Sequence, residues 1–303
     1  MKRLTLILAL FSALSANAQE TYTFASRDTC DLKLDIYRPA PGAETTLDGK
    51  AKPAVMFAFG GGFVSGARND KYLVDFYRKL NENGYPVVAI DYRLGMKYVK
   101  VGNGLAGAFK AVKAFEHSQN VGVEDVFSAV EYLRSHPELG IDTNNLVISG
   151  NSAGAIISLA SEYAVISGEC PIPDFNFKGV MSFAGAIIST EGAPKFKTRP
   201  CPILMFHGTS DKAVAYKSLA FFGRGLWGSS HIAKKLAKKE YPHSIYRYED
   251  RTHDVAAYML VVLPQVLSFL ENDVIKGTAR FIDATIDDPS LPSWGNISMD
   301  DIY

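Results

Sequence analysis

Residues 146–154 read Leu-Val-Ile-Ser-Gly-Asn-Ser-Ala-Gly, and this stretch decides the fold. Its first three residues form an apolar run typical of a buried strand, and the mostly apolar residues 155–160 that follow suit a helix. A strand, a tight turn and a helix are the context in which the pattern Gly-x-Ser-x-Gly exposes a serine hydroxyl above a sheet. The pattern alone is weak, since about one chain in ten of this length contains it by chance. The flanking elements make Ser152 a candidate nucleophile, with an ordinary serine in a glycine-rich turn as the alternative.

The composition bounds the size and class of the protein. The chain has 303 residues, of which 47% are hydrophobic, enough for one large α/β domain or for two small ones. Lysine plus arginine equal aspartate plus glutamate at 32 each. This neutral balance gives no support for a nucleic-acid partner or an anionic membrane surface.

The N-terminal residues have the organisation of a signal peptide. The basic pair Lys2-Arg3 precedes an apolar run at residues 4–14 and the small-residue sequence Ala-Asn-Ala at residues 16–18. The run is too short to span a membrane, and no cysteine follows it for a lipid anchor. We expect residues 1–18 to be removed and the protein to be exported, periplasmic or secreted, without a membrane anchor. A buried N-terminal helix is the alternative.

Export permits disulfides, and the chain has three cysteines. Cys170 and Cys201 both fall at the sheet edge opposite the expected site, so either they form a bridge or they are small buried apolar residues. Cys30 lies in a turn between two early strands and is the candidate odd thiol.

Strand-like and helix-like segments alternate along the chain. We expect strands at residues 20–27, 32–37, 53–59, 85–91, 146–148, 177–184, 202–206 and 244–248, and helices at residues 70–83, 123–135, 155–160, 232–241 and 254–270. The first two strands alternate in hydrophobicity, as in an antiparallel pair, whereas later apolar runs are typical of parallel strands buried on both faces. The order predicts one α/β domain over residues 19–271, with a mostly parallel central sheet, N-terminal antiparallel strands and helices on both faces.

Three segments do not follow this alternation. Residues 95–122 are an insertion with apolar residues at helical spacing, either a cap over the site or a plain surface helix. Residues 220–230 are an aromatic and glycine loop around Trp227, which either borders a substrate pocket or packs in the core. Residues 272–303 are expected to be a mostly irregular, acidic surface tail.

Several candidate site residues directly follow predicted strands. They are residues 60–62 (Gly-Gly-Gly), Ser152, Asp211 and His253. Because ligands of such sheets bind at the carboxyl ends of the strands, we expect these residues to meet at one edge. A serine hydroxyl needs a base to become a nucleophile, and a histidine oriented by a carboxylate is the usual base. The chain order Ser152, Asp211, His253 is one in which this triad occurs, with His253 as general base and then acid.

Other histidines and carboxylates are weaker candidates for these roles. His207 is expected to support the loop that carries the candidate acid, and His231 is a distant second choice for the base. Asp250 is the alternative acid because it is close to the candidate base in sequence. Asp254 is expected to cap the helix that follows.

The three glycines exceed what a turn needs, and ordering them costs entropy, so we expect the backbone to approach a ligand there. The backbone N–H groups of Gly61, Gly62 and Ala153 are candidate donors to an oxyanion, and losing one such donor typically costs about 3 kcal/mol. The candidate pocket residues are Phe63, Asn151 and Trp227. The sequence contains no metal-ligand pattern and no dinucleotide-binding glycine pattern, so no metal or cofactor is expected.

Five short motifs occur in a fixed order. They are Leu-Asp-Ile-Tyr-Arg-Pro at residues 34–39, Phe-Gly-Gly-Gly-Phe at 59–63, Asp-Tyr-Arg-Leu at 91–94, the nucleophile motif at 150–154 and His-Gly-Thr-Ser-Asp at 207–211. Together they resemble the carboxylesterase branch of the α/β-hydrolase superfamily, with a hormone-sensitive-lipase-like or feruloyl- and acetyl-esterase-like pattern. The resemblance covers roughly residues 22–270. It implies the fold, the triad and a structural bond between Arg93 and Asp125.

The sequence departs from the family pattern at three points. Phe59 stands where the family often has a histidine that shapes the oxyanion loop. Ala155 stands where many relatives have a second glycine, and Thr252 precedes the candidate base where a small residue is more usual.

The resemblance implies a serine carboxylic-ester hydrolase that forms an acyl-enzyme. Together with the export expected from the N-terminal residues, it predicts a small ester or an acylated carbohydrate, either acetyl or feruloyl, as the substrate. The alternatives are a serine peptidase or a lipase of the same fold, and a non-catalytic binding protein on a hydrolase scaffold. Peptidases of the prolyl-oligopeptidase type carry a large N-terminal propeller, for which this sequence has no room before the core. Non-catalytic relatives usually lack a triad member.

Overall fold

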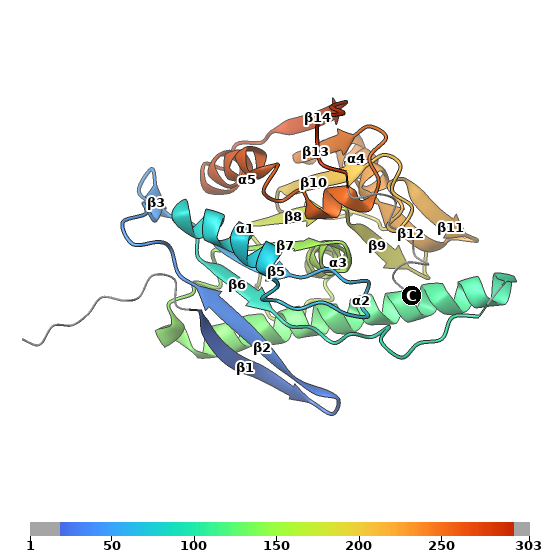
Figure 1. Ribbon diagram of the computed structural model, residues 1–303, viewed down its shortest axis with the longest axis horizontal. Helices are drawn as coiled ribbons and strands as arrows, with labels where there is room; N and C mark the ends of the chain where they lie inside the picture. The colour runs from blue at the N-terminus through green and yellow to red at the C-terminus, as the bar shows by residue number, and fades with distance from the viewer. Residues whose placement is uncertain (1–18, 103, 294–303) are drawn as a thin grey trace, which may run out of the picture.

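The computed structural model describes residues 19–102 and 104–293, so the expected signal peptide lies outside the described residues. A nine-stranded sheet with the order β1-β2-β6-β5-β7-β8-β10-β13-β14 forms the centre of the molecule (Figure 1). Its strands are β1 (Glu20–Arg27), β2 (Cys30–Tyr37), β5 (Ala54–Ala58), β6 (Val87–Ile90), β7 (Leu146–Asn151), β8 (Gly179–Phe183), β10 (Ile203–Gly208), β13 (His243–Tyr248) and β14 (Phe281–Ile286). Two-residue strands β3 (Thr46–Leu47) and β4 (Lys50–Ala51) form a separate small hairpin.

Most neighbouring strands of this sheet are parallel. β1 pairs antiparallel with β2, and β2 pairs antiparallel with β6. Every further pair, from β6 to β14, is parallel. Strands β5, β6 and β8 bury every residue, which explains their continuous apolar runs. The predicted fold class, a mostly parallel sheet with N-terminal antiparallel strands, is confirmed.

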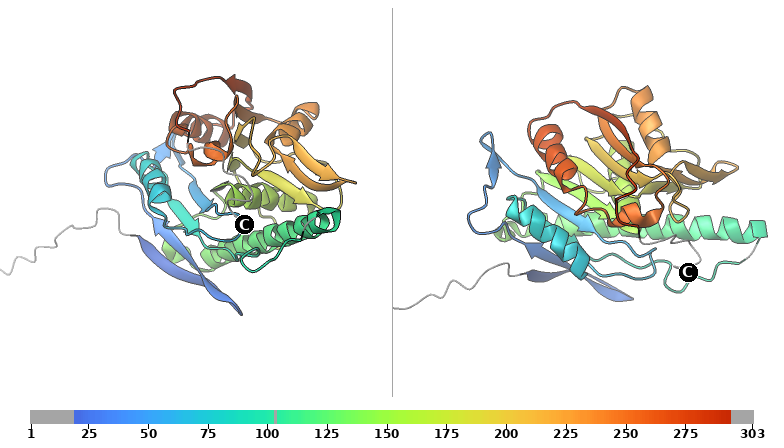
Figure 2. Two further views of the ribbon diagram at one scale, coloured as in Figure 1. Left: turned by 45° about the vertical axis from the view of Figure 1, so that its right-hand side comes forward. Right: turned by 45° about the horizontal axis from the view of Figure 1, so that its top comes forward.

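Helices cover both faces of the sheet. They are α1 (Lys71–Glu82), α2 (Gly104–Ser135), α3 (Ala153–Ser167), α4 (Ser229–Lys238) and α5 (Leu263–Phe269). Helices α1 and α5 lie over one face and α2 and α3 over the other, and the views of Figures 1 and 2 agree on this. Helix α1 begins where the Asp70 carboxylate accepts a hydrogen bond from the Tyr72 N–H, and it buries one apolar face.

Helix α2 is one continuous helix of 32 residues. The sequence placed a boundary at Gly122, between an insertion and a separate helix. Instead, a Cβ at Gly122 would lie 2.6 Å from Ile157 Cδ1, so this glycine lets α2 pack closely on α3. The part of α2 before Gly122, which belongs to the expected insertion at residues 95–122, extends past the edge of the sheet (Figure 1).

The aromatic segment at residues 220–230 is a hairpin and a helix start, which corrects the expected loop. Strand β11 (Ser218–Phe221) pairs antiparallel with β12 (Arg224–Gly228). Strand β12 also pairs with β9 (Ala186–Ser189), giving a second, three-stranded sheet. Pairing with β9, which is distant in sequence, provides hydrogen-bond partners for the backbone of β12. No local sequence pattern predicts this pairing.

The C-terminal region also differs from expectation. The helix expected at residues 254–270 is interrupted, with a 3₁₀ turn at η2 (His253–Ala257), then α5, then the π-helical η3 (Leu270–Ile275). A proline in the first turn of α5 favours a new helix start there. The tail expected to be irregular adds β14 to the sheet, parallel to β13, while residues 294–303 lie outside the described part of the chain.

The three cysteines carry free thiols. Cys170 and Cys201 are not bridged, and Cys30 is exposed at the start of β2. The disulfide alternative is therefore not the one that the structure adopts.

Candidate active site

Ser152 lies at the sharp turn between β7 and α3. Its φ of 52° is positive, a conformation that non-glycine residues rarely adopt. The flanking glycines make the turn possible, because a Cβ at Gly150 would lie 2.4 Å from the Gly154 carbonyl carbon and a Cβ at Gly154 would lie 2.0 Å from the Ala58 oxygen. The Ser152 N–H donates to the Phe183 carbonyl at 2.8 Å, which ties the turn to β8.

The structure brings Ser152, His253 and Asp211 into one hydrogen-bonded chain. The Ser152 hydroxyl donates to His253 Nε2 at 2.8 Å. The Nδ1–H group of His253 donates to Asp211 Oδ2 at 2.7 Å. All three residues are buried. They come from the end of β7, the loop after β10 and the start of η2, at the carboxyl edge that the sequence predicted.

The Asp211 carboxylate is surrounded by donors. Its Oδ1 accepts hydrogen bonds from the N–H groups of Ala213 and Val214, each at 2.9 Å. His207 Nε2 lies 3.3 Å from Oδ2. Burial by itself raises the pKa of Asp211, but the hydrogen bonds from His207 and His253 outweigh it and hold the pKa well below its usual value. Asp211 is therefore ionised at neutral pH and can stabilise a histidine cation.

His207 supports the loop that carries Asp211, as predicted. It is fully buried, its Nε2–H donates to the Val214 carbonyl at 3.0 Å, and its Nδ1 lies 2.8 Å from Ser229 Oγ. Both ring nitrogens are thus engaged away from the nucleophile.

The other residues considered for the roles of base and acid lie in different environments. The His231 ring lies on α4, with its centroid 6.4 Å from that of Trp227. Asp250 is exposed, and its N–H donates to Thr209 Oγ1. Asp254 lies in the first turn of η2, where it is buried and accepts a hydrogen bond from Ser293 Oγ at 3.1 Å.

The glycine loop after β5 lies against the nucleophile. A Cβ at Gly60 would lie 2.9 Å from Asn151 Nδ2 and 3.2 Å from the Ser152 Cβ, so a larger residue there would crowd the turn that carries the nucleophile. Gly61 and Gly62 both have positive φ, at 124° and 61°. Phe59, where the family often has histidine, fills the position by packing, since its ring lies 4.5 Å from the ring of Tyr92.

The structural bond implied between Arg93 and Asp125 is present. The Asp125 side chain is buried, and both of its oxygens lie 3.0 Å from Arg93 Nε. The backbone N–H of Arg93 also donates to Asp125 Oδ2, at 2.8 Å. This pair fastens the loop after β6 to the middle of α2.

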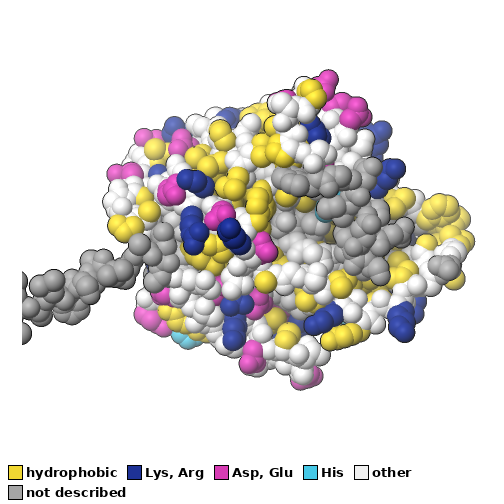
Figure 3. Space-filling view, in the orientation of Figure 1, with side chains coloured by type: hydrophobic (Ala, Val, Ile, Leu, Met, Phe, Trp, Pro, Cys, Tyr) yellow, Lys and Arg dark blue, Asp and Glu magenta, His cyan; other side chains and the backbone are white. Residues whose placement is uncertain are grey.

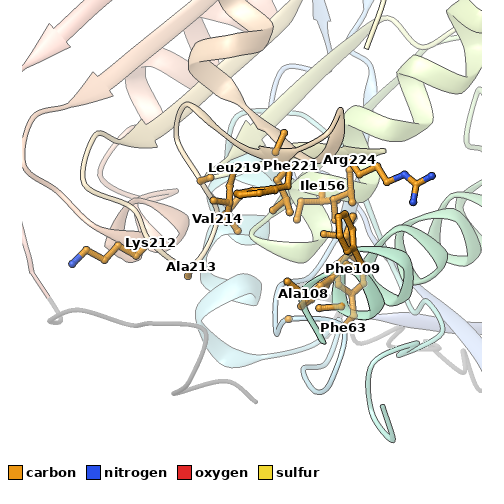
Figure 4. Close-up of a pocket in the computed structure, with 18 of the residues that line it drawn as sticks. Phe63, Ala108, Phe109, Ile156, Lys212, Ala213, Val214, Leu219, Phe221 and Arg224 are labelled. Atoms are coloured by element: carbon orange, nitrogen blue, oxygen red, sulfur yellow. The ribbon is translucent and has the colours of Figure 1, made fainter. Parts of the chain in front are cut away.

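Two cavities include Ser152 in their linings. The first, of about 470 Å³, is almost entirely apolar and lies between the start of α2, the β11–β12 hairpin and α3 (Figure 4). Its lining includes Phe63, Ala108, Phe109, Val112, Phe115, Ile156, Val214, Leu219 and Phe221. The second, of about 390 Å³, is lined by the glycine loop, Asp70, Tyr72, Asn151 and His253.

The linings of the two cavities show where the predicted pocket residues lie. Phe63 lines the first cavity and Asn151 the second. Trp227 is buried in β12 and does not belong to the lining of either cavity, so its packing alternative holds. Sequence reasoning did not name Phe109 or Phe221 as pocket residues. The signal available for Phe109 was the helical spacing of apolar residues after Leu105, and the signal for Phe221 was its place in the aromatic segment at residues 220–230.

Residues 19–102 and 104–293 contain no cluster of three His, Cys, Asp or Glu side chains that could hold a metal ion. Within the same ranges, no helix combines the length and apolar character needed to cross a bilayer.

The fold and this arrangement of side chains define a serine hydrolase of the α/β-hydrolase class. The sequence profile of the carboxylesterase family matches residues 12–165, about half of the chain, and that of the phospholipase/carboxylesterase family matches residues 109–249. The chain belongs to the carboxylesterase family. No curated protein sequence matches it.

Solved structures share the fold at low sequence identity. Esterase 2 of the planctomycete Thermogutta terrifontis, a thermophilic esterase, superimposes with a TM-score of 0.60 at 23% identity, covering 85% of this chain and 93% of that one. A puromycin-hydrolyzing peptidase of Mycobacterium tuberculosis superimposes with a TM-score of 0.56 at 19% identity, covering 89% of this chain and 42% of that one. At these identities the likeness shows a common fold.

Proposed function

We propose that this carboxylesterase forms its acyl-enzyme on Ser152. The hydrogen-bonded chain from Ser152 through His253 to Asp211 carries the proposal. His253 takes the hydroxyl proton as Oγ attacks the ester carbonyl, and Asp211 stabilises the resulting cation. His253 then gives that proton to the departing alcohol. A water molecule repeats the sequence on the acyl-enzyme, which releases the acid and restores the serine.

Backbone donors stabilise the negative oxygen of each tetrahedral intermediate in this proposal. The N–H of Ala153, at the first position of α3, and those of Gly61 and Gly62 are the assigned donors. Gly60 already brings the loop to within van der Waals distance of Ser152. The helix dipole at the start of α3 favours negative charge at the same point.

The two cavities assign the two halves of the ester. His253 lines the second cavity, whereas the lining of the first, drawn from the described residues, does not include it. Because the general acid must reach the leaving oxygen, the alcohol belongs in the second cavity. Asp70, Tyr72 and Asn151 give that side polar groups that suit a hydroxyl-rich alcohol such as a sugar. The acyl group then occupies the first, apolar cavity.

The first cavity favours an aromatic acyl group over acetyl. It is far larger than an acetyl group needs, and four phenylalanines contribute to its walls: Phe63, Phe109, Phe115 and Phe221. Of the two carbohydrate esters that the sequence suggested, this supports feruloyl esters. Export, proposed from residues 1–18, would bring the enzyme to polymeric substrates outside the cell.

A peptidase is the second candidate, because the mycobacterial puromycin-hydrolyzing peptidase has the same fold. This chain covers less than half of that protein, so the likeness does not extend to its other parts. Amide substrates distinguish the two activities.

Hydrolysis of p-nitrophenyl acetate, methyl ferulate and an amino-acid p-nitroanilide tests the function. We expect the wild type to cleave the two esters faster than the anilide, and Ser152→Ala to lower kcat by about 10⁴-fold or more. Ser161→Ala, which removes another buried serine hydroxyl of α3, is the matched control and should keep its activity. No cleavage of any ester, or equal activity of the two variants, contradicts the proposal.

Filling the first cavity tests the acyl assignment. Ala108→Trp adds a large side chain to its wall, and we expect kcat/KM for methyl ferulate to fall by at least about tenfold, with a smaller loss for acetate. Lys110→Trp, on the same helix but exposed and outside the lining, is the control. Equal losses on both esters would place the acyl group elsewhere.

A further inference from the structure

Exposed apolar side chains gather around the mouth of the first cavity. Among the described residues, eight large apolar side chains are exposed, and six of them lie on two segments, the approach to α2 and the end of β11. These six form what we call the apolar rim: Tyr98, Val101, Leu105, Leu219, Phe221 and Phe222. Tyr98 and Phe222 are 87% and 85% exposed, so they contribute almost nothing to the core.

The two segments of the rim border the same opening. Leu105 from one segment and Leu219 and Phe221 from the other all line the first cavity. The start of α2 and strand β11 project from the same end of the molecule (Figure 1), and Figure 3 shows apolar side chains gathered at that edge. The rim is therefore continuous with the cavity that opens on Ser152.

The charged residues within the two segments that carry the rim are all basic. The chain as a whole is neutral, yet residues 92–115 and 212–239 contain no aspartate or glutamate. The exposed side chains of Lys97, Lys100, Lys217 and Arg224 stand among the rim residues. A surface that combines apolar and basic side chains is complementary to a layer with an apolar interior and anionic head groups.

We propose that the apolar rim docks on an anionic lipid–water interface. Its aromatic and aliphatic side chains enter the boundary between head groups and acyl chains, and its lysines and arginine contact the anionic head groups. The mouth of the first cavity then faces the lipid, so an ester dissolved there reaches Ser152 without crossing water. A protein partner fits less well, because lysine is depleted at the centres of protein–protein interfaces.

Sedimentation with vesicles measures this docking without any turnover. We expect the full-length protein to bind vesicles of phosphatidylcholine with phosphatidylglycerol more tightly than vesicles of phosphatidylcholine alone. The double variant Tyr98→Ser/Phe222→Ser should bind at least about tenfold more weakly. Neither residue belongs to the lining of the two cavities at Ser152, so hydrolysis of a soluble ester should not change. Lys97→Gln and Lys100→Gln should each weaken anionic binding about fivefold.

Phe281→Ser is the matched control, since Phe281 is 57% exposed on β14, outside the rim. An equal loss of binding in this control, or no binding of the wild type to anionic vesicles, overturns the proposal. Sedimentation in the absence of lipid gives a third outcome. A dimer that the Tyr98→Ser/Phe222→Ser variant dissolves would make the rim an interface between copies and would also refute it. Because binding needs no catalysis, failure of ester hydrolysis leaves this test intact.

Discussion

Replacing Asp211 with asparagine changes one carboxylate oxygen into an amide nitrogen at the centre of the proposed triad. In the native site Oδ1 accepts from the N–H groups of Ala213 and Val214, and Oδ2 accepts from His253. An asparagine keeps the two backbone bonds only if its carbonyl oxygen takes the place of Oδ1. Its NH₂ group then points at His253 Nδ1.

This orientation reverses the hydrogen bond to the base. A neutral imidazole facing an N–H donor must present an unprotonated Nδ1, so its proton moves to Nε2. A protonated Nε2 cannot accept the Ser152 proton across the 2.8 Å that separates them. The equivalent change in other serine hydrolases lowers kcat about 10⁴-fold. That loss corresponds to about 5 kcal/mol at about 1.4 kcal/mol for each factor of ten.

The assay compares kcat on a soluble p-nitrophenyl ester, with thermal unfolding to verify that each variant is folded. The control is Asp250→Asn, which changes the exposed carboxylate near the base in sequence, and we expect its kcat to stay within about twofold of wild type. A kcat for Asp211→Asn within tenfold of wild type would refute the orientation of His253 by Asp211. Loss of activity in Asp250→Asn would transfer the role of acid to that residue.

Three further changes test the scaffold. Gly154→Ala places a methyl group 2.0 Å from the Ala58 oxygen, so we expect both kcat and Tm to fall, measured by turnover and thermal unfolding. Burial raises the pKa of Glu162 to about 7 from 4.5, so the folded protein holds a proton that the unfolded chain releases. Stability should therefore fall by about 3 kcal/mol as the pH rises from 4.5 to 7, with the full loss persisting above 7, and Glu162→Gln should flatten this decline in urea titrations. Asp125→Ala leaves Arg93 without its buried partner and should cost about 3–5 kcal/mol of unfolding free energy, whereas Glu124→Ala, which removes the exposed partner of the same guanidinium, should cost about 1 kcal/mol or less.

The sheet and the triad were readable from the sequence because both depend on local signals. Most of the parallel strands are apolar runs in the sequence, and Ser152, Asp211 and His253 each follow a predicted strand. Since strand ends in a parallel sheet share an edge, chain order was enough to bring together residues that are 101 positions apart.

The errors in the expected strands lie where pairing between distant segments decides the structure. Strand β14 alternates between exposed and half-exposed residues, so it lacks the apolar run of a buried strand and becomes a strand only by pairing with β13. Strand β12 depends on β9 in the same way. Trp227 of β12 is buried, whereas Phe221 at the end of β11 lines the first cavity.

Helix α2 joins the Arg93–Asp125 anchor and the cavity wall at Phe109 in one rigid rod, about 48 Å long at 1.5 Å per residue. A small tilt of α2 at its contact with α3 produces a larger displacement at the distant end of α2, near Phe109. Gly122 lies at this contact and sets how closely α2 approaches Ile157. The width of the first cavity thus depends on how α2 packs on α3 at Gly122, and it can be changed there without altering a residue of the cavity lining.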